Sequence, residues 1–147
     1  MPETYTAGQK LRASQMPAPY TVAALCSGNL VQSTTVLTAI PGATVTFTTR
    51  NATASVLIMG IFDITTTTGG TGTASGYCQV NGSTQSQQAI WDLVTAGARG
   101  TLSQTWTANL TTPGSQTIDL LANLNTASGS ATFSATHTTI TVLVMDY

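Results

Sequence analysis

Apolar residues alternate with threonine, serine and asparagine over much of this chain, with the period of two that is typical of β-strands. In residues 44–49, Val45 and Phe47 would face one side of a strand and threonines the other. Residues 56–64 are more continuously apolar, which predicts a central strand covered on both faces. The pattern predicts eight short strands, at residues 44–49, 56–64, 77–80, 89–93, 102–110, 118–124, 131–135 and 138–144.

Turn-forming pairs separate these strands and help to define the fold class. They are Pro41-Gly42, Gly69-Gly70, Asn81-Gly82, Pro113-Gly114 and Ser128-Gly129. Residues 70–76 are rich in glycine but lack both the glycine spacing and the lysine of a phosphate-binding loop. We expect residues 65–75 to be a flexible loop between strands. Short antiparallel strands without a repeat of fixed period predict an all-β fold, an antiparallel β-sandwich or jelly roll.

The first 32 residues differ from the rest because they are rich in proline and contain half of the basic residues. A weak capping pattern predicts a short helix at residues 11–15, which the following Met-Pro-Ala-Pro segment would end. This part holds too little apolar material for an independent domain. We therefore divide the chain into an extended N-terminal attachment arm at residues 1–32 and a jelly-roll domain at residues 33–147.

Charge is scarce throughout the chain. Only 6% of the residues are charged and the formal net charge is -1, whereas a typical soluble domain has about 25% charged residues. An uncharged surface loses little when it is buried, because few ions must be desolvated, so we expect a homo-oligomer. The chain has four basic and five acidic residues and so lacks the excess of positive charge that nucleic-acid binding needs. No apolar run is long enough to span a membrane or resembles a secretory signal, so we expect synthesis in a cytoplasm without membrane insertion.

Residues that could support catalysis are few and scattered. The chain has one histidine, His137, and carboxylates such as Asp63 and Asp92 are not paired in the local sequence. No motif places a nucleophile, a base and a carboxylate together, and none has metal-ligand spacing. We predict no enzyme activity, no metal and no cofactor, and a structural or surface role for His137. Cys26 and Cys78 are expected to be free, partly buried thiols, with one disulfide as the alternative.

Aromatic side chains are the remaining candidates for binding, because a sugar can stack on an aromatic face without any charge. The candidates are Tyr20, Tyr77, Trp91 and Trp106. Trp106 shares its parity with the apolar residues of its strand and is expected to be core. Trp91 and Tyr77 remain candidate glycan-binding residues.

Two parts of the chain resemble known phage proteins. The opening Tyr5-Thr-Ala-Gly-Gln-Lys-Leu-Arg-Ala-Ser-Gln15 resembles the TAGQ-x-L-x-A-S segment of small virion proteins of actinobacterial phages and prophages, where it begins an arm that attaches a β domain to the particle. Residues 33–147 are similar in pattern to the trimeric jelly rolls of phage decoration proteins and tail-fibre tips, which in turn look like tumour-necrosis-factor and C1q heads. This likeness includes a Trp-bearing middle strand, the Ala-Thr-Phe-Ser sequence at 131–134 and a last apolar strand at 138–146.

The resemblance implies a non-enzymatic bacteriophage structural protein on the exterior of the virion, made in the host cytoplasm. It implies a homotrimeric capsid decoration protein whose arm binds a major capsid protein or a tail protein. The arm residues expected to attach it are Lys10, Leu11, Arg12, Met16 and Tyr20. The alternative is a small tail-fibre or spike head that binds a host receptor or surface glycan. A depolymerase is a third hypothesis, which the sparse ionisable residues disfavour.

Overall fold

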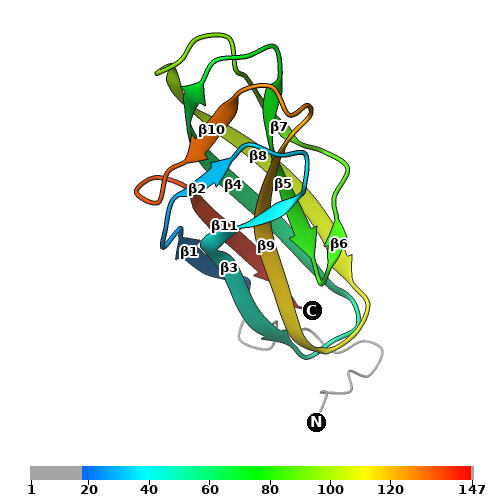
Figure 1. The fold of residues 1–147 in the computed structure, drawn as a ribbon. Coiled ribbons are helices and arrows are strands. Elements are labelled where there is room, and N and C mark those ends of the chain that lie inside the picture. Colours follow the sequence, from blue (N-terminus) through cyan, green and yellow to red (C-terminus); the bar gives the residue numbers. More distant parts are fainter. Residues whose placement is uncertain (1–17, 147) are drawn as a thin grey trace, which may run out of the picture.

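The computed structural model describes residues 18–146, which form a two-layer antiparallel β-sandwich, as Figure 1 shows. This confirms the predicted fold class. The strands are β1 (Tyr20–Leu25), β2 (Leu30–Gln32), β3 (Thr38–Thr49), β4 (Ala54–Thr68), β5 (Thr73–Val80), β6 (Ser83–Thr84), β7 (Ala89–Asp92), β8 (Arg99–Leu110), β9 (Gly114–Leu124), β10 (Ser130–Phe133) and β11 (Thr139–Met145). Each of the eight predicted strands is present, and most are longer than predicted because paired neighbours extend them.

Sheet A is organised around the 15-residue strand β4. One edge of β4 pairs along its length with β8. The other edge pairs first with β11, from Ser55 to Ile61, and then with β10, from Ile64 to Thr68. Strand β1 continues the sheet beyond β11, and β2 continues it beyond β10. A gap in pairing on this edge therefore lies at Phe62 and Asp63, between the end of β10 and the start of β11.

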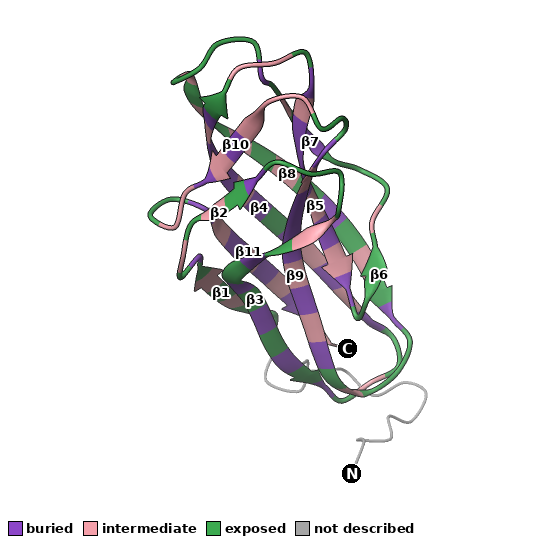
Figure 2. Ribbon diagram, viewed as in Figure 1, coloured by how far each residue is buried: buried purple, intermediate pink, exposed green. Residues whose placement is uncertain are grey.

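Sheet B has β9 between β3 and β5, and both β6 and β7 pair with the far edge of β5. Buried and exposed residues alternate along β3, as Figure 2 shows, because one side of each strand faces the core. The turn between β5 and β6 uses Asn81 and Gly82, both with positive φ (48° and 83°), a conformation suited to a tight hairpin.

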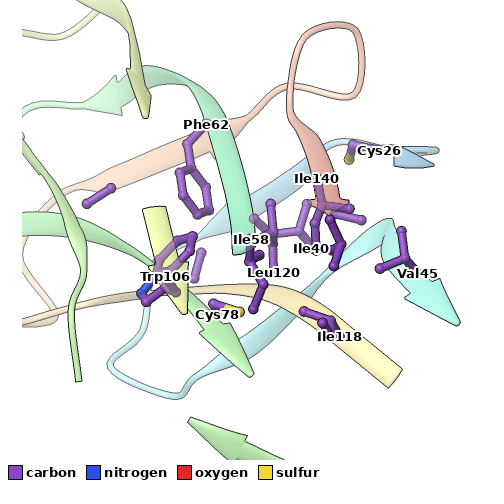
Figure 3. Close-up of a cluster of buried hydrophobic side chains, with 14 of the residues drawn as sticks. Cys26, Ile40, Val45, Ile58, Phe62, Cys78, Trp106, Ile118, Leu120 and Ile140 are labelled. Carbon is purple, nitrogen blue, oxygen red and sulfur yellow. The ribbon is translucent and has the colours of Figure 1, made fainter. Parts of the chain in front are cut away.

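The core lies between the two sheets and is almost entirely apolar (Figure 3). Phe62 is fully buried, with its ring edge-to-face against Trp106 and Phe133 at centroid distances of 6.4 and 6.2 Å. Trp106 is 2% exposed, which confirms the prediction that it is core. Cys26 and Cys78 are both free and buried, and burial raises the pKa of Cys78 to about 12, so that this thiol stays protonated.

Three local predictions were wrong. The pair Pro41-Gly42 does not end a strand but forms an irregularity within β3, where the register with β9 shifts between Ala39 and Thr44. Most of segment 65–75 is strand rather than loop, because β8 and β10 pair with the end of β4 and β5 begins at Thr73. Strand β4 is central, but its outer side is not fully covered, since Met59 is 46% exposed.

The predicted arm extends too far into the sandwich. Residues 20–25 and 30–32 are strands β1 and β2, which pair with β11 and β10 in sheet A. The local pattern concealed β1 because it is an edge strand with one inward side, where only Val22 and Ala24 reach the core. Its stability comes largely from main-chain pairing with β11, which side-chain periodicity does not report. Residues 1–17, including the predicted helix at 11–15, lie outside the described residues.

Candidate functional site

The side of sheet A that faces away from sheet B carries a regular array of side chains. Residues paired across antiparallel strands point to the same side, so the register fixes the neighbours. The array has three rows of four: Leu25, Thr139, Ile61 and Ser103; Ala23, Thr141, Met59 and Thr105; Thr21, Leu143, Leu57 and Thr107. We call these residues the outer array.

The outer array is uncharged and has an apolar centre. None of its side chains is ionisable, and the aliphatic groups of β4 occupy its middle. Met59 is 46% exposed and Leu25 is 56% exposed. Neighbouring apolar side chains of this kind typically mark a surface that contacts another molecule. Because no ion would be desolvated, the outer array can be buried against a neutral apolar surface at low electrostatic cost.

Three ionisable side chains meet at one end of the outer array. Arg99, at the start of β8, donates two hydrogen bonds to the buried carboxylate of Asp63, from Nε to Oδ1 at 3.0 Å and from Nη2 to Oδ2 at 2.5 Å. His137 lies in the connection between β10 and β11, and its Nδ1 is 3.2 Å from Asp63 Oδ2 and 3.2 Å from Arg99 Nη2. The side chains of Arg99 and His137 are 54% and 60% exposed.

This cluster clamps the gap in sheet A. The Asp63 main-chain N–H donates to Thr138 Oγ1, and the Asp63 carbonyl accepts from the Ser134 N–H, which fixes the β10–β11 connection on β4. The hydrogen bond from Arg99 lowers the pKa of Asp63, burial opposes this, and the charge of Arg99 and contact with His137 lower it further. The carboxyl is thus held ionised and paired, a state suited to structural stabilisation rather than to proton donation.

The variant Arg99→Met should have a lower free energy of unfolding than wild type. This difference should be largest at neutral pH and should become smaller in acid. A lowered folded-state pKa means that the contribution of Asp63 is present above the unfolded-state pKa, about 4, and is lost as pH falls through the folded-state pKa. Urea unfolding of both proteins from pH 7 down to about pH 2 measures this difference in the free energy of unfolding. Arg50→Met removes the same charge elsewhere and should show little such dependence. A stability difference between wild type and Arg99→Met that does not vary with pH would contradict the stabilising role of the Asp63–Arg99 pair.

The structure describes one of the five predicted attachment residues. Lys10, Leu11, Arg12 and Met16 lie outside the described residues. Tyr20 begins β1, is 39% exposed, and donates its hydroxyl to the Thr48 carbonyl at 3.2 Å. Tyr20 is paired with Val144 of β11, so the chain enters the sandwich beside its last strand.

The two candidate glycan-binding residues point to opposite sides of sheet B. Trp91 is paired with the buried Ala74, packs on Gly100 of sheet A and donates from Nε1 to Thr66 Oγ1 at 2.9 Å. Tyr77 has the opposite parity along β5 and is paired with Leu121. The two side chains therefore do not form a single stacking platform, because alternate residues of a strand face opposite ways.

Within residues 18–146, no group of three or more His, Cys, Asp or Glu side chains is arranged to hold a metal ion. No helix in this part of the chain has the length and apolar character needed to cross a membrane.

The outer array has a signal in the sequence, but the signal has a different cause from the one predicted. The continuous apolar run at 56–64 predicts a strand covered on both sides within the fold, whereas Leu57, Met59 and Ile61 face outward. The Asp63 cluster had no local signal, because its three residues come from β4, β8 and the β10–β11 connection.

Comparisons with known proteins find similarity only among solved structures, since no family model and no curated protein matches the chain. A structure of infectious bursal disease virus, Gt strain, is 10% identical with a TM-score of 0.47, covering 99% of this chain and 38% of that one. Eiger TNF from S. frugiperda is 10% identical with a TM-score of 0.49, covering 84% and 91%. Latent PorU from Porphyromonas gingivalis is 15% identical with a TM-score of 0.40, covering 97% and 14%. This chain thus spans less than half of the viral and bacterial chains.

Proposed function

We propose that this protein is a non-enzymatic structural component of a virus particle, a homotrimeric decoration protein on the exterior of a phage capsid. In this proposal the outer array joins the subunits and the N-terminal arm attaches them to the major capsid protein. The observation that carries the assembly part is the uncharged, apolar-centred outer array. The virion part rests on the resemblance of residues 5–15 to phage attachment arms.

Self-association suits the chemistry of the outer array. Its rows of threonine and aliphatic residues bear no charge, so neighbouring subunits that pack on it around a threefold axis would meet no charge that must be neutralised. The charged groups of sheet A lie at its margins, with the Asp63 cluster at one end. At the other end, Asp146 accepts hydrogen bonds from the main-chain N–H groups of Arg50 and Asn51. A neutral centre with polar margins is typical of protein interfaces.

A structural rather than catalytic role agrees with how three of the four described acidic side chains are used. Asp63 is paired with Arg99, Asp146 accepts main-chain hydrogen bonds, and Asp119 accepts from the Thr44 hydroxyl at 2.6 Å. General acid–base catalysis needs ionisable groups free to exchange protons with a substrate. The carboxylates placed on β4, β9 and after β11 instead serve the fold.

Deleting residues 2–17 should abolish incorporation into particles and leave a folded trimer, because the deletion spares every described strand. Three weak arms acting together would give the wild type its avidity. Quantitative mass spectrometry of purified particles, scaled to the major capsid protein, measures copy number, and light scattering measures the oligomeric state.

The copy number separates the alternatives. A fixed, high ratio of wild-type protein to the major capsid protein is expected for capsid decoration. A few copies in multiples of three would contradict decoration and favour the tail or spike head. Complete absence from particles, or unchanged incorporation of the deletion variant, would overturn the proposal.

A further inference from the structure

A polar cleft lies at the open edge of the sandwich, at the end of β8, where Asn109 follows Thr107 of the outer array on the same side of sheet A. It has a volume of about 390 Å³ and is lined by the β5–β6 hairpin, the last residues of β8 and the turn that follows β8. The hairpin and the end of β8 lie near each other in Figure 1. The cleft is at the lower end of the size range of small-molecule sites.

The lining of the cleft is polar but uncharged. Four of its residues carry side-chain amides, three carry hydroxyls and the other three are apolar. Val80 and Leu110 are buried and form an apolar floor. A charged ligand would leave water here without meeting an opposite charge, which is costly, whereas a neutral polar ligand would find both donors and acceptors.

The inner wall of the cleft is held rigid by a network of amides. Asn81 Nδ2 donates to Gln116 Oε1 at 2.6 Å, and Asn81 Oδ1 accepts from the Thr117 main-chain N–H at 2.8 Å. Gln116 is buried, and its Nε2 donates to Thr49 Oγ1 and to the Thr112 carbonyl. Asn81 has a φ of 48°, a left-handed conformation that asparagine tolerates better than most residues. The network therefore holds the wall in one conformation before any ligand arrives.

Other polar groups at the cleft are available to a ligand. Within the described part of the chain, the hydroxyls of Ser83 and Thr111 have no hydrogen-bond partner, and the same is true of Asn109 Nδ2. Asn109 Oδ1, by contrast, accepts from the Ser55 hydroxyl at 3.0 Å, which orients the amide. A fixed wall and an apolar floor are thus combined with free donors and acceptors at the rim.

From the uncharged amide and hydroxyl lining over an apolar floor, we infer that this cleft binds a neutral saccharide. The ring hydroxyls of a sugar both donate and accept hydrogen bonds, as the rim groups do, and its C–H surface can rest on Val80 and Leu110. An extended peptide also has a neutral main chain, but it would need several pockets for alternate side chains. The cleft is a single small pocket and therefore suits a peptide less well. This inference goes beyond the particle role and does not depend on it.

Titration of the ¹⁵N-labelled full chain with glucose, galactose and N-acetylglucosamine tests the inference. We expect saturable amide shifts at Asn81, Ser83 and Asn109 for at least one sugar, with a dissociation constant of about 1–10 mM. Glucosamine and glucuronate, which carry a positive and a negative charge on similar rings, should bind about tenfold more weakly.

Matched variants locate the site. Ser83→Ala combined with Asn109→Ala should weaken binding about tenfold or more. Ser33→Ala combined with Gln88→Ala removes one hydroxyl and one side-chain amide outside both the cleft lining and the outer array, and it should leave binding unchanged. Three results would overturn the inference. They are no shift with any neutral sugar, binding by the cleft variant that equals that of wild type, or shifts at Asn81, Ser83 and Asn109 with a neutral peptide only.

Discussion

Phe62→Ala is expected to lower the free energy of unfolding by about 3–5 kcal/mol, the usual cost of removing a buried aromatic ring. Phe62 has no exposed surface, and its ring lies edge-to-face against Trp106 and Phe133. The cavity has little means of closing. A Cβ placed on Gly76 would lie 2.6 Å from the Phe62 ring, so the Gly76 main chain already touches it, and only a large main-chain shift could fill the space.

Urea unfolding measures this loss as a lower midpoint with an unchanged slope, at one fixed protein concentration so that subunit association is constant. Val31→Ala also shortens an apolar side chain, but Val31 is 60% exposed. This variant should therefore change the free energy of unfolding by no more than about 0.5 kcal/mol. A loss below about 1 kcal/mol for Phe62→Ala would show that the core between the sheets can rearrange and that the described packing is wrong.

Met59→Glu is expected to convert the proposed trimer into folded monomers at micromolar concentration. Met59 lies in the middle row of the outer array, flanked by Thr141 of β11 and Thr105 of β8. In the assembly, each glutamate would be buried where no described residue of the outer array has a positive charge. Burial of an unpaired carboxylate costs more than the contacts of one side chain recover.

Light scattering measures the molecular mass of the purified protein in solution, and circular dichroism verifies that the variant is folded. Thr46→Glu places the same charge on the exposed side of β3 in sheet B and should leave the trimer intact. Met59→Gln, which is polar but uncharged, should weaken association less than Met59→Glu. A wild-type chain that is monomeric, or a Met59→Glu variant that stays trimeric, would rule out the outer array as the subunit interface.

The body of the sandwich could be predicted from the sequence because its main signals are local. In β3, β9 and β11, apolar and polar residues alternate, since one side of each strand is buried against the opposite sheet. The pairs Asn81-Gly82 and Pro113-Gly114 mark turns because the left-handed φ values there suit few other residues. Parity alone predicts that Trp106 belongs to the core, and its burial follows from the same alternation.

Strand β1 and the candidate sites were harder to predict because their partners are distant in sequence. Hydrogen bonding to β11 makes residues 20–25 a strand, although an isolated segment with two small inward residues has a weak pattern. Trp91 and Tyr77 could not be assigned to opposite sides of sheet B until the pairing of β5 with β7 and β9 was known. Asn81 and Asn109 line one cleft only because the β5–β6 hairpin and the end of β8 lie near each other.

By itself, the sequence determined that this protein is an all-β sandwich with a sparsely charged surface. These properties follow from side-chain periodicity and composition, which each segment carries regardless of its neighbours. Tertiary structure alone decided that Asp63, Arg99 and His137 form a clamp. It also decided that Leu57, Met59 and Ile61 of β4 face outward as part of the outer array. The physical reason is that strand register and sheet order bring residues together across long stretches of chain, and no local pattern encodes which strands will be neighbours.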